Sequence, residues 1–317
     1  MLALRAICPP ELTDALVDVL RRHPGATHVV RLPGAAVDPP GDVLLADVAR
    51  EAASDVLAAL QDVPGGGDCA YALEVVDTAL SRHADAAERA APGRGVDAVV
   101  WEEVEARTGE ESSLSVSFLA LLVLASLLSA VGVLLDSAVL IVGAMAVGPE
   151  FGPVAGLTVA LVERRWSLAR RSLTALAVGF PLAAVAALLL TLAVRGTAGL
   201  PASYTGEQRL FTAFISQPDG YALVVALLAG VAGVVSLTSA KSAALVGVAV
   251  SVTTVPAASL VGVAAAAGRW DECLGAAAQL GVNLFALVLA GGVTLAARRT
   301  ASRRRRALRR GGPTPRG

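Results

Sequence analysis

Long apolar runs between Ser112 and Arg298 are the feature that most restricts how this chain can fold. A helix needs about 20 mostly apolar residues to cross a bilayer. About six segments of this region meet that requirement: Leu114–Leu135, Ser137–Val162, Ser172–Val194, Tyr221–Ser239, Ser242–Ala267 and Cys273–Ala297. We therefore expect residues 114–297 to form an α-helical transmembrane domain with about six transmembrane helices.

The composition excludes several classes of protein. Charged residues are only 17% of the 317 residues and hydrophobic residues are 55%, whereas soluble domains are nearer a quarter charged. Three cysteines are too few for a disulfide scaffold or a Cys-rich metal module. The net charge of −1 argues against a nucleic-acid partner. The apolar half lacks histidine, and the chain has no HExxH, GxSxG or phosphate-binding motif, so we expect no enzyme activity, cofactor or metal.

Residues 1–80 alternate short strand and helix patterns. Strands are expected at Leu2–Ile7, Thr27–Leu32, Asp42–Val48 and Cys69–Leu80, and helices at Glu11–His23 and Ala52–Val63. The prolines and glycines between Pro33 and Gly41 indicate a loop. The order βαββαβ predicts an α+β, ferredoxin-like domain, which is compatible with either a scaffold or a ligand sensor.

The arginine distribution predicts the orientation in the membrane. Residues 81–113 form a polar linker, in which Val96–Ala106 is expected to be a juxtamembrane helix. The loop Glu163–Arg171 and the basic tail at 298–317 are both rich in arginine, and they fall on one side if the spans alternate. With no secretory signal at the start, we expect a multi-pass protein of a prokaryotic plasma membrane, with both termini cytoplasmic. Membrane lipids are expected partners of the tail, which otherwise serves only to fix the topology.

Two segments of the apolar half resemble each other. Ser137–Trp166 and Ser242–Trp270 both begin with Ser-Ala after a lone charged residue, carry proline near the middle and end in Arg-Trp. They are offset by an odd number of spans and so run in opposite directions. This pattern predicts an inverted repeat of two three-span units, 114–194 and 221–297.

Proline interrupts both repeated segments near the middle of a predicted span. Pro149 and Pro153 interrupt the first, and Pro256 interrupts the second. Proline removes a backbone donor, and such breaks survive in membranes where they line protein or a watery cavity. Paired interrupted helices in corresponding positions of two inverted units indicate a substrate or ion site at the midplane.

Glu150, between the first two of these prolines, is the foremost candidate residue. A carboxylate at mid-bilayer is costly unless it faces a cavity or a partner. It either binds a cation or proton, or caps the broken helix through free backbone amides. Thr253 and Thr254 are candidates to line the same site, and Gln279 with Asn283 form the next polar pair, which alternatively joins helices.

Small residues at helical spacing favour close helix contacts. Gly143 with Val147 and Gly230 with Gly233 are examples. The expected sheet also has edges that can pair with another copy. We therefore expect a homo-oligomer.

The apolar half resembles the domain-of-unknown-function family 389, a group of uncharacterised prokaryotic membrane proteins. The likeness rests on Leu135–Met145, Pro149, Gly152-Pro153, Ala243–Val250, Val255-Pro256 and Asn283. It implies a hydrophobic membrane domain behind a variable cytoplasmic N-terminal part, and it implies no activity. Glu150 stands where the family more often has an apolar residue, so the resemblance does not extend to its role.

These observations favour a secondary transporter or channel-like carrier of a small solute or ion, with a cytoplasmic regulatory domain. The alternative is a membrane-anchored sensor or assembly scaffold whose soluble domain binds a ligand or partner. A transporter predicts a polar cavity at the proline breaks, whereas a scaffold predicts that apolar neighbours fill them.

Overall fold

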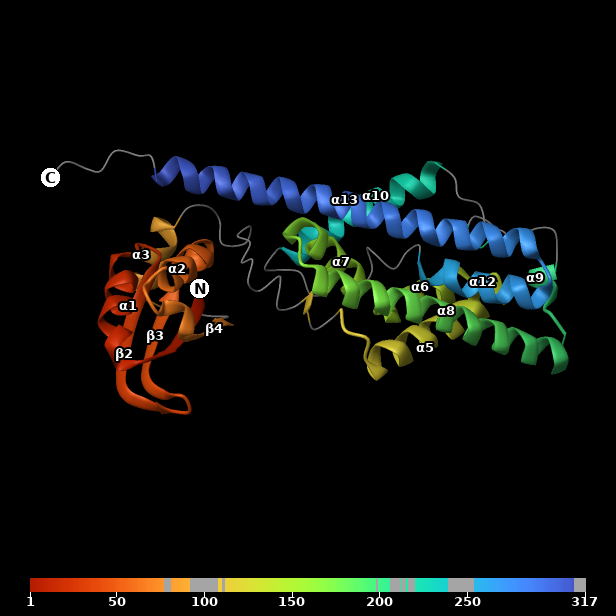
Figure 1. Ribbon diagram of the computed structural model, residues 1–317. Coiled ribbons are helices and arrows are strands. Elements are labelled where there is room, and N and C mark those ends of the chain that lie inside the picture. The colour runs from red at the N-terminus through yellow and green to blue at the C-terminus, as the bar shows by residue number, and fades with distance from the viewer. Residues whose placement is uncertain are drawn as a thin grey trace. The chain divides into compact units, whose positions relative to one another are not determined.

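The computed structural model describes residues 1–76, 81–91, 108–109, 112–197, 199–205, 212, 215, 220–238 and 254–310, with side chains up to 301 (Figure 1). The expected juxtamembrane helix at Val96–Ala106 and the candidate Thr253 lie outside these residues. The chain forms two compact units, the first of Met1–Val104 with Thr238–Lys241 and the second of Glu105–Leu237 and Ser242–Gly317. Each unit is described by itself.

The first unit is a four-stranded antiparallel sheet with helices. Its elements are β1 (Leu2–Cys8), α1 (Pro10–Arg22), β2 (Ala26–Val37), β3 (Pro40–Val48), α2 (Ala53–Gln61), β4 (Ala70–Val75) and α3 (Arg82–Ala90), with short 3-10 turns at Arg50–Ala52 and Gly66–Asp68. The strand order is β2-β3-β1-β4 (Figure 1). The predicted βαββαβ order is therefore found in the described chain.

Alternate strand residues of this sheet form a core with α1 and α2. Leu2, Leu4 and Leu44 are buried, and Leu16 and Leu60 from the two helices are fully buried in the same cluster. Each of the two helices thus packs its apolar face on the sheet. The burial of these apolar side chains stabilises the packing of the helices on the sheet.

The β2–β3 connection differs from the expected loop. Strand β2 continues through Pro33 and Gly34, with a register shift between Leu32 and Ala36. Because β2 is an edge strand, its proline removes no ladder hydrogen bond that the sheet requires. The loop prediction for this segment was wrong because proline and glycine signal irregular backbone, which a bulged edge strand also provides.

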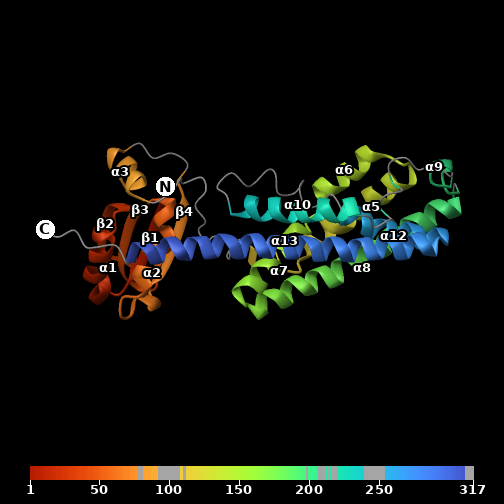
Figure 2. The same cartoon turned by 90° about the horizontal axis from the view of Figure 1, so that it is seen from above.

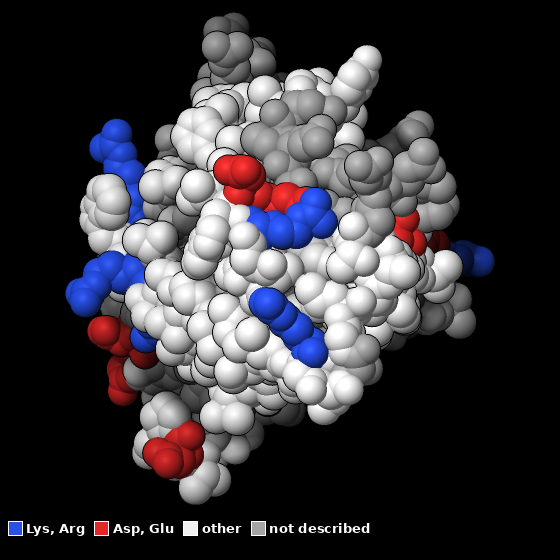
Figure 3. Space-filling model, turned by 90° about the vertical axis from the view of Figure 1, so that its right-hand side faces the viewer, with Lys and Arg blue, Asp and Glu red and all other residues white. Residues whose placement is uncertain are grey.

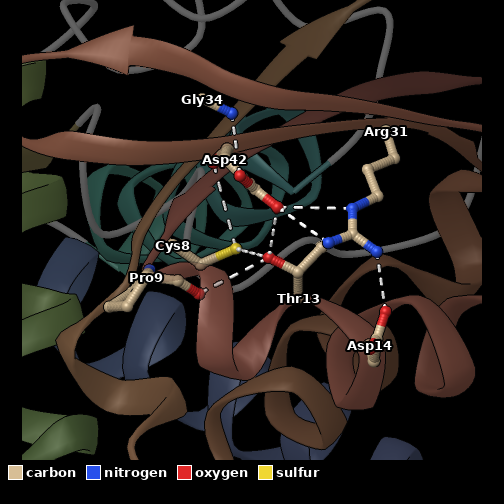
Figure 4. A network of polar contacts seen from close by, with 7 residues as sticks. All are labelled: Cys8, Pro9, Thr13, Asp14, Arg31, Gly34 and Asp42. Carbon is tan, nitrogen blue, oxygen red and sulfur yellow. Dashed lines mark hydrogen bonds and ion pairs between the residues drawn. The ribbon is translucent and has the colours of Figure 1, made fainter.

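Asp42 holds this hairpin to the end of β1 and the start of α1 (Figure 4). Its carboxylate is buried and accepts hydrogen bonds from the Gly34 amide at 2.8 Å, the Thr13 hydroxyl at 2.9 Å and Arg31 Nη2 at 3.1 Å. These bonds, the Gly34 amide first, favour the charged form and lower the pKa of Asp42 below its ordinary value.

Hydrogen bonds and an ion pair connect α3 to the strands of the same unit. The Ser81 hydroxyl accepts a hydrogen bond from the His83 amide and lies 2.8 Å from His28 Nε2. His28 Nδ1 in turn lies 2.7 Å from Asp47 Oδ2 on β3. Glu88 of α3 binds the amino terminus of Met1 at 3.2 Å.

The second unit is helical. It contains α5 (Val116–Leu134), α6 (Ala138–Val147), α7 (Phe151–Glu163), α8 (Trp166–Thr197), α9 (Ala202–Thr205), α10 (Gly220–Leu237), α12 (Val255–Ala267) and α13 (Trp270–Arg310). Among the described residues, four helices are long and apolar enough to cross a membrane: α5, α8, α10 and α13. The pair α6–α7, bent by 55°, is a candidate for a fifth span. The chain is therefore a multi-pass membrane protein by the length and composition of its helices.

The count of six spans stays a prediction. Its fifth expected member, Ser242–Ala267, lies partly outside the described residues, and α12 is the described part. With 13 residues, α12 by itself is shorter than a bilayer-crossing helix.

The helices of this unit pack around α8 and α13 (Figures 1 and 2). Helices α5, α7 and α12 contact α8, and α7, α10 and α12 contact α13. Helix α12 also contacts α5. Gly262 permits the close approach of α12, since a Cβ there would lie 2.1 Å from the Ala184 carbonyl oxygen on α8.

Gly230, one of the small residues expected to mark an oligomer contact, packs within the chain. A Cβ at this position would lie 2.7 Å from the Leu287 carbonyl oxygen on α13. The homo-oligomer therefore stays a prediction without support from this residue.

Charged side chains gather at the two ends of the helical unit. At one end Glu163, the last residue of α7, forms an ion pair with Arg299 of α13. At the other end Arg269 pairs with Glu272 at 2.6 Å, and Arg195 donates to the Ala266 carbonyl at 2.8 Å. Figure 3 shows acidic and basic side chains meeting in the middle of a largely uncharged surface.

Candidate functional site

The site is built on a break between α6 and α7. The helical ladder of α6 ends with the Gly148 amide bonded to the Ala144 carbonyl, and it resumes with the Val154 amide bonded to the Glu150 carbonyl. Pro149 stands in the break, where its missing N–H costs no helical bond. Pro153 lies in the first turn of α7, where amides have no intrahelical partner in any case.

Glu150 lies in this break and is fully buried, with 0% of its side chain surface exposed. Its Oε1 accepts a hydrogen bond of 2.8 Å from the Thr254 hydroxyl. Its Oε2 has no hydrogen-bond partner among the described residues. Gly148 leaves the room that this carboxylate fills, because a Cβ at Gly148 would lie 2.3 Å from Glu150 Oε2.

Thr254 immediately precedes the second broken helix. Helix α12 begins at Val255, with Pro256 in its first turn, where proline is tolerated. The Thr254 side chain makes no capping hydrogen bond to α12 and bonds across to Glu150. Glu150 likewise makes no side-chain capping bond to α7.

Gln279 and Asn283 lie one turn apart on α13. The Gln279 Nε2 donates to Asn283 Oδ1 at 3.1 Å, and both side chains are buried. This bond lies within one helix, and the bond between helices expected from the sequence stays a prediction. The Gln279 Oε1 has no partner in the described part of the chain.

Helix α13 also packs against α7. A Cβ at Gly291 would lie 3.2 Å from Thr158 Cγ2, and further along the two helices Glu163 pairs with Arg299.

Sequence reasoning missed a second polar contact to α12. The hydroxyls of Ser129 on α5 and Ser259 on α12 lie 2.7 Å apart, and both side chains are fully buried. An isolated serine in an apolar span is the signal that could have marked them, because such hydroxyls need a partner in lipid.

The arrangement offers oxygen atoms and a buried carboxylate. Oxygen ligands suit hard cations, and a carboxylate also suits a proton. No group of three or more His, Cys, Asp or Glu side chains suited to a metal ion occurs in the described ranges. The chemistry available is therefore that of a single acidic group with a hydroxyl neighbour.

One comparison with known protein families gives a match, and the match covers this site. Residues 145–289 match the model of the family described as Domain of unknown function (DUF389). The match covers a little less than half of the 317 residues. The matched segment runs from the last turn of α6 into α13 and contains Glu150, Thr254, Gln279 and Asn283. No curated protein and no solved structure matches the chain.

Proposed function

We propose that the helical unit is a secondary transporter or channel-like carrier of a cation or proton, and that the first unit is its cytoplasmic regulatory domain. The observation that carries this proposal is the Glu150 carboxylate, fully buried between two helix breaks and bonded to Thr254 at 2.8 Å. Its second oxygen, without a partner among the described residues, is the position for a bound ion or proton.

The cost of burying a carboxylate supports a functional role. An ionised group within the membrane is unfavourable by several kcal/mol unless something compensates its charge. One hydroxyl hydrogen bond offsets only a part of that cost, about 1.5–3 kcal/mol. A cation or proton on Glu150 would remove the remainder, and its release would then be coupled to movement of the two broken helices.

A repeat in the helix boundaries supports the inverted-repeat architecture. Glu150 and Thr254 are 104 residues apart. The same separation relates the starts of α5 and α10, of α7 and α12, and of α8 and α13. Helices α7 and α12 each have 13 residues and are followed by a residue with left-handed backbone, Arg164 or Gly268, and then by Arg-Trp.

The two short helices also run toward opposite ends of the unit. Helix α7 ends at Glu163, which pairs with Arg299, whereas α12 ends beside Arg195 at the far end of α8. Opposite directions are what two inverted units require. In this proposal Glu150 and Thr254 occupy equivalent positions on either side of the pseudo-twofold axis.

The charges at the helix ends support the proposed orientation. Arg164, Arg165 and Arg170 lie at the end marked by the Glu163–Arg299 ion pair. Arginine concentrates on the cytoplasmic side of membrane proteins. We therefore propose that this end, with both termini, faces the cytoplasm of a prokaryotic cell.

A sensor or scaffold is the second candidate, and one observation favours it. A cavity of about 800 Å³ in the helical unit is lined entirely by apolar residues, and its lining includes neither Glu150 nor Thr254. A carrier therefore needs another conformation in which water reaches the carboxylate from one side.

Ion flux into liposomes tests the proposal. The full chain is reconstituted, and flux of H⁺, Na⁺ and K⁺ is followed with trapped indicator dyes under imposed gradients. We expect flux that Glu150→Gln abolishes and Thr254→Ser retains, with both variants eluting as the parent in size-exclusion chromatography. Parental vesicles that pass none of these ions, or a Glu150→Gln variant that carries them at the parental rate, would contradict the carrier.

A further inference from the structure

The apolar cavity of about 800 Å³ lies along one face of α8. Its lining on this helix runs from Leu173 to Leu188, and α12 and α13 supply the other walls. That stretch of α8 is ~22 Å long at 1.5 Å per residue. Leu173 and Phe285, at 58% and 68% exposed, mark its open side.

The lining chemistry suits hydrocarbon. Every lining residue is Ala, Gly, Leu, Val, Phe or Pro. Cavities lined in this way hold apolar ligands and exclude water. At ~22 Å, the lined stretch is longer than one half of a bilayer about 30 Å thick, so an extended acyl chain lying parallel to the helices fits within it.

One end of the cavity is basic and aromatic. Counting back along α8 from Leu173, Arg170 and Trp166 lie three and seven residues earlier, on the same helical face as the lining. Both side chains are exposed, and Arg170 forms no ion pair with a described residue. Tryptophan side chains are common at the headgroup level of a membrane, and arginine side chains there attract anionic headgroups.

We propose that this cavity binds an acyl chain of an anionic phospholipid, with its phosphate at Arg170 and its glycerol region beside Trp166. The charge of Arg170 selects the headgroup, and the apolar walls hold the chain. The site is separate from Glu150, although Ala258 of the lining donates its amide to the Thr254 carbonyl at 3.0 Å.

Glycines on α13 provide a matched pair of variants. Gly281 lines the cavity, and a Cβ there would meet no described atom within 4 Å. Gly292 is equally unobstructed on the same helix and is not in the lining. Gly281→Phe therefore fills the cavity, whereas Gly292→Phe adds the same bulk elsewhere. Arg170 has its own control in Arg171, which is rotated about 100° away on the helix.

The test is native mass spectrometry of the delipidated full chain in mild detergent, titrated with dioleoyl phosphatidylglycerol or dioleoyl phosphatidylcholine. We expect the anionic lipid to bind ~5-fold more tightly, the effect of one basic residue at a membrane surface. Arg170→Gln should remove this preference and Arg171→Gln should keep it. Gly281→Phe should lose both lipids, and Gly292→Phe should bind both as the parent does. If Gly281→Phe aggregates, Ala277→Leu on the same lining replaces it.

Two results would overturn the proposal. The first is parental phosphatidylglycerol binding by the cavity-filling variant. The second is a change in the ratio of monomer to oligomer in Gly281→Phe with lipid binding unchanged, since the cavity would then be a contact between two copies of the chain.

Discussion

Thr254 donates a hydrogen bond of 2.8 Å to the carboxylate of Glu150, from a position 104 residues further along the chain. Each residue immediately precedes a helix of 13 residues, α7 or α12. The bond therefore links the starts of two short helices that end at opposite sides of the unit. Any movement of one helix relative to the other must change the surroundings of the carboxylate.

Replacing the hydroxyl at Thr254 should destabilise the helical unit. Thr254→Val keeps the shape but leaves Glu150 without its donor, at a cost of about 1–3 kcal/mol in the free energy of unfolding. Thr254→Ser keeps the hydroxyl and should lose less than about 1 kcal/mol. Unfolding in mixed detergent, followed by circular dichroism, measures both. Equal stability of the valine and serine variants would show that the bond contributes little.

A methyl group at Gly148 should displace the carboxylate. A Cβ there would lie 2.3 Å from Glu150 Oε2, so Gly148→Ala forces the side chain away from its present position. We expect a loss of ion flux of ten-fold or more, on the order of the effect of misplacing a positioned group. Gly143→Ala on the same helix is the control, because its Cβ would meet only Leu128 at 3.8 Å. Equal ion flux through the two alanine variants would contradict this role of Gly148.

The Glu163–Arg299 ion pair should show coupling in a double-mutant cycle. Glu163 is only 10% exposed, so removing Arg299 leaves a carboxylate that water reaches poorly. Each single change to Gln should reduce the unfolding free energy by roughly 2 kcal/mol, and the double change should cost less than the sum. Thermal unfolding of the four proteins gives the coupling, and strict additivity would exclude a direct interaction.

Asp42 should make the first unit sensitive to acid. Because hydrogen bonds from Gly34 and Thr13 lower its pKa, its contribution to stability is complete above its unfolded value of 3.8 and is lost as the pH falls through the lower folded value. Asp42→Asn should therefore reduce stability at pH 7 and flatten the pH dependence below pH 4. Urea unfolding of fragment 1–91 between pH 7 and pH 2 measures this.

The control for Asp42 is Asp14, which also bonds Arg31 but is 89% exposed. Asp14→Asn should change the stability at pH 7 by less than about 0.5 kcal/mol, as for other exposed pairs. An all-helical circular-dichroism spectrum of fragment 1–91 would contradict independent folding of the sheet.

Cysteine labelling should distinguish the two ends of the helical unit. In a Cys273→Ala background, Ala301→Cys should react with an impermeant maleimide only after the cells are lysed. Thr197→Cys, at the other end of α8, should react in intact cells. Cys8 and Cys69 are buried and need not be replaced. Reaction of the Ala301→Cys variant in intact cells would invert the proposed topology.

Local patterns in the sequence predicted much of the secondary structure. Helical periodicity predicted α1 at Glu11–His23, and apolar runs predicted α5, α8, α10 and α13, because each depends only on neighbours within a few turns. The extension of β2 through Pro33 was not predicted, since the tolerance of an edge strand for proline depends on its place in the sheet.

The sequence by itself determined that Glu150 lies at a break in an apolar helix, since Pro149 and Pro153 interrupt the local hydrogen bonding. Only the tertiary structure decided which group that carboxylate contacts. The choice of Thr254, with Gly148 leaving the space, depends on how two helices far apart in the chain pack together. Helical periodicity is a local property, whereas the partner of a buried side chain is fixed by packing between distant segments.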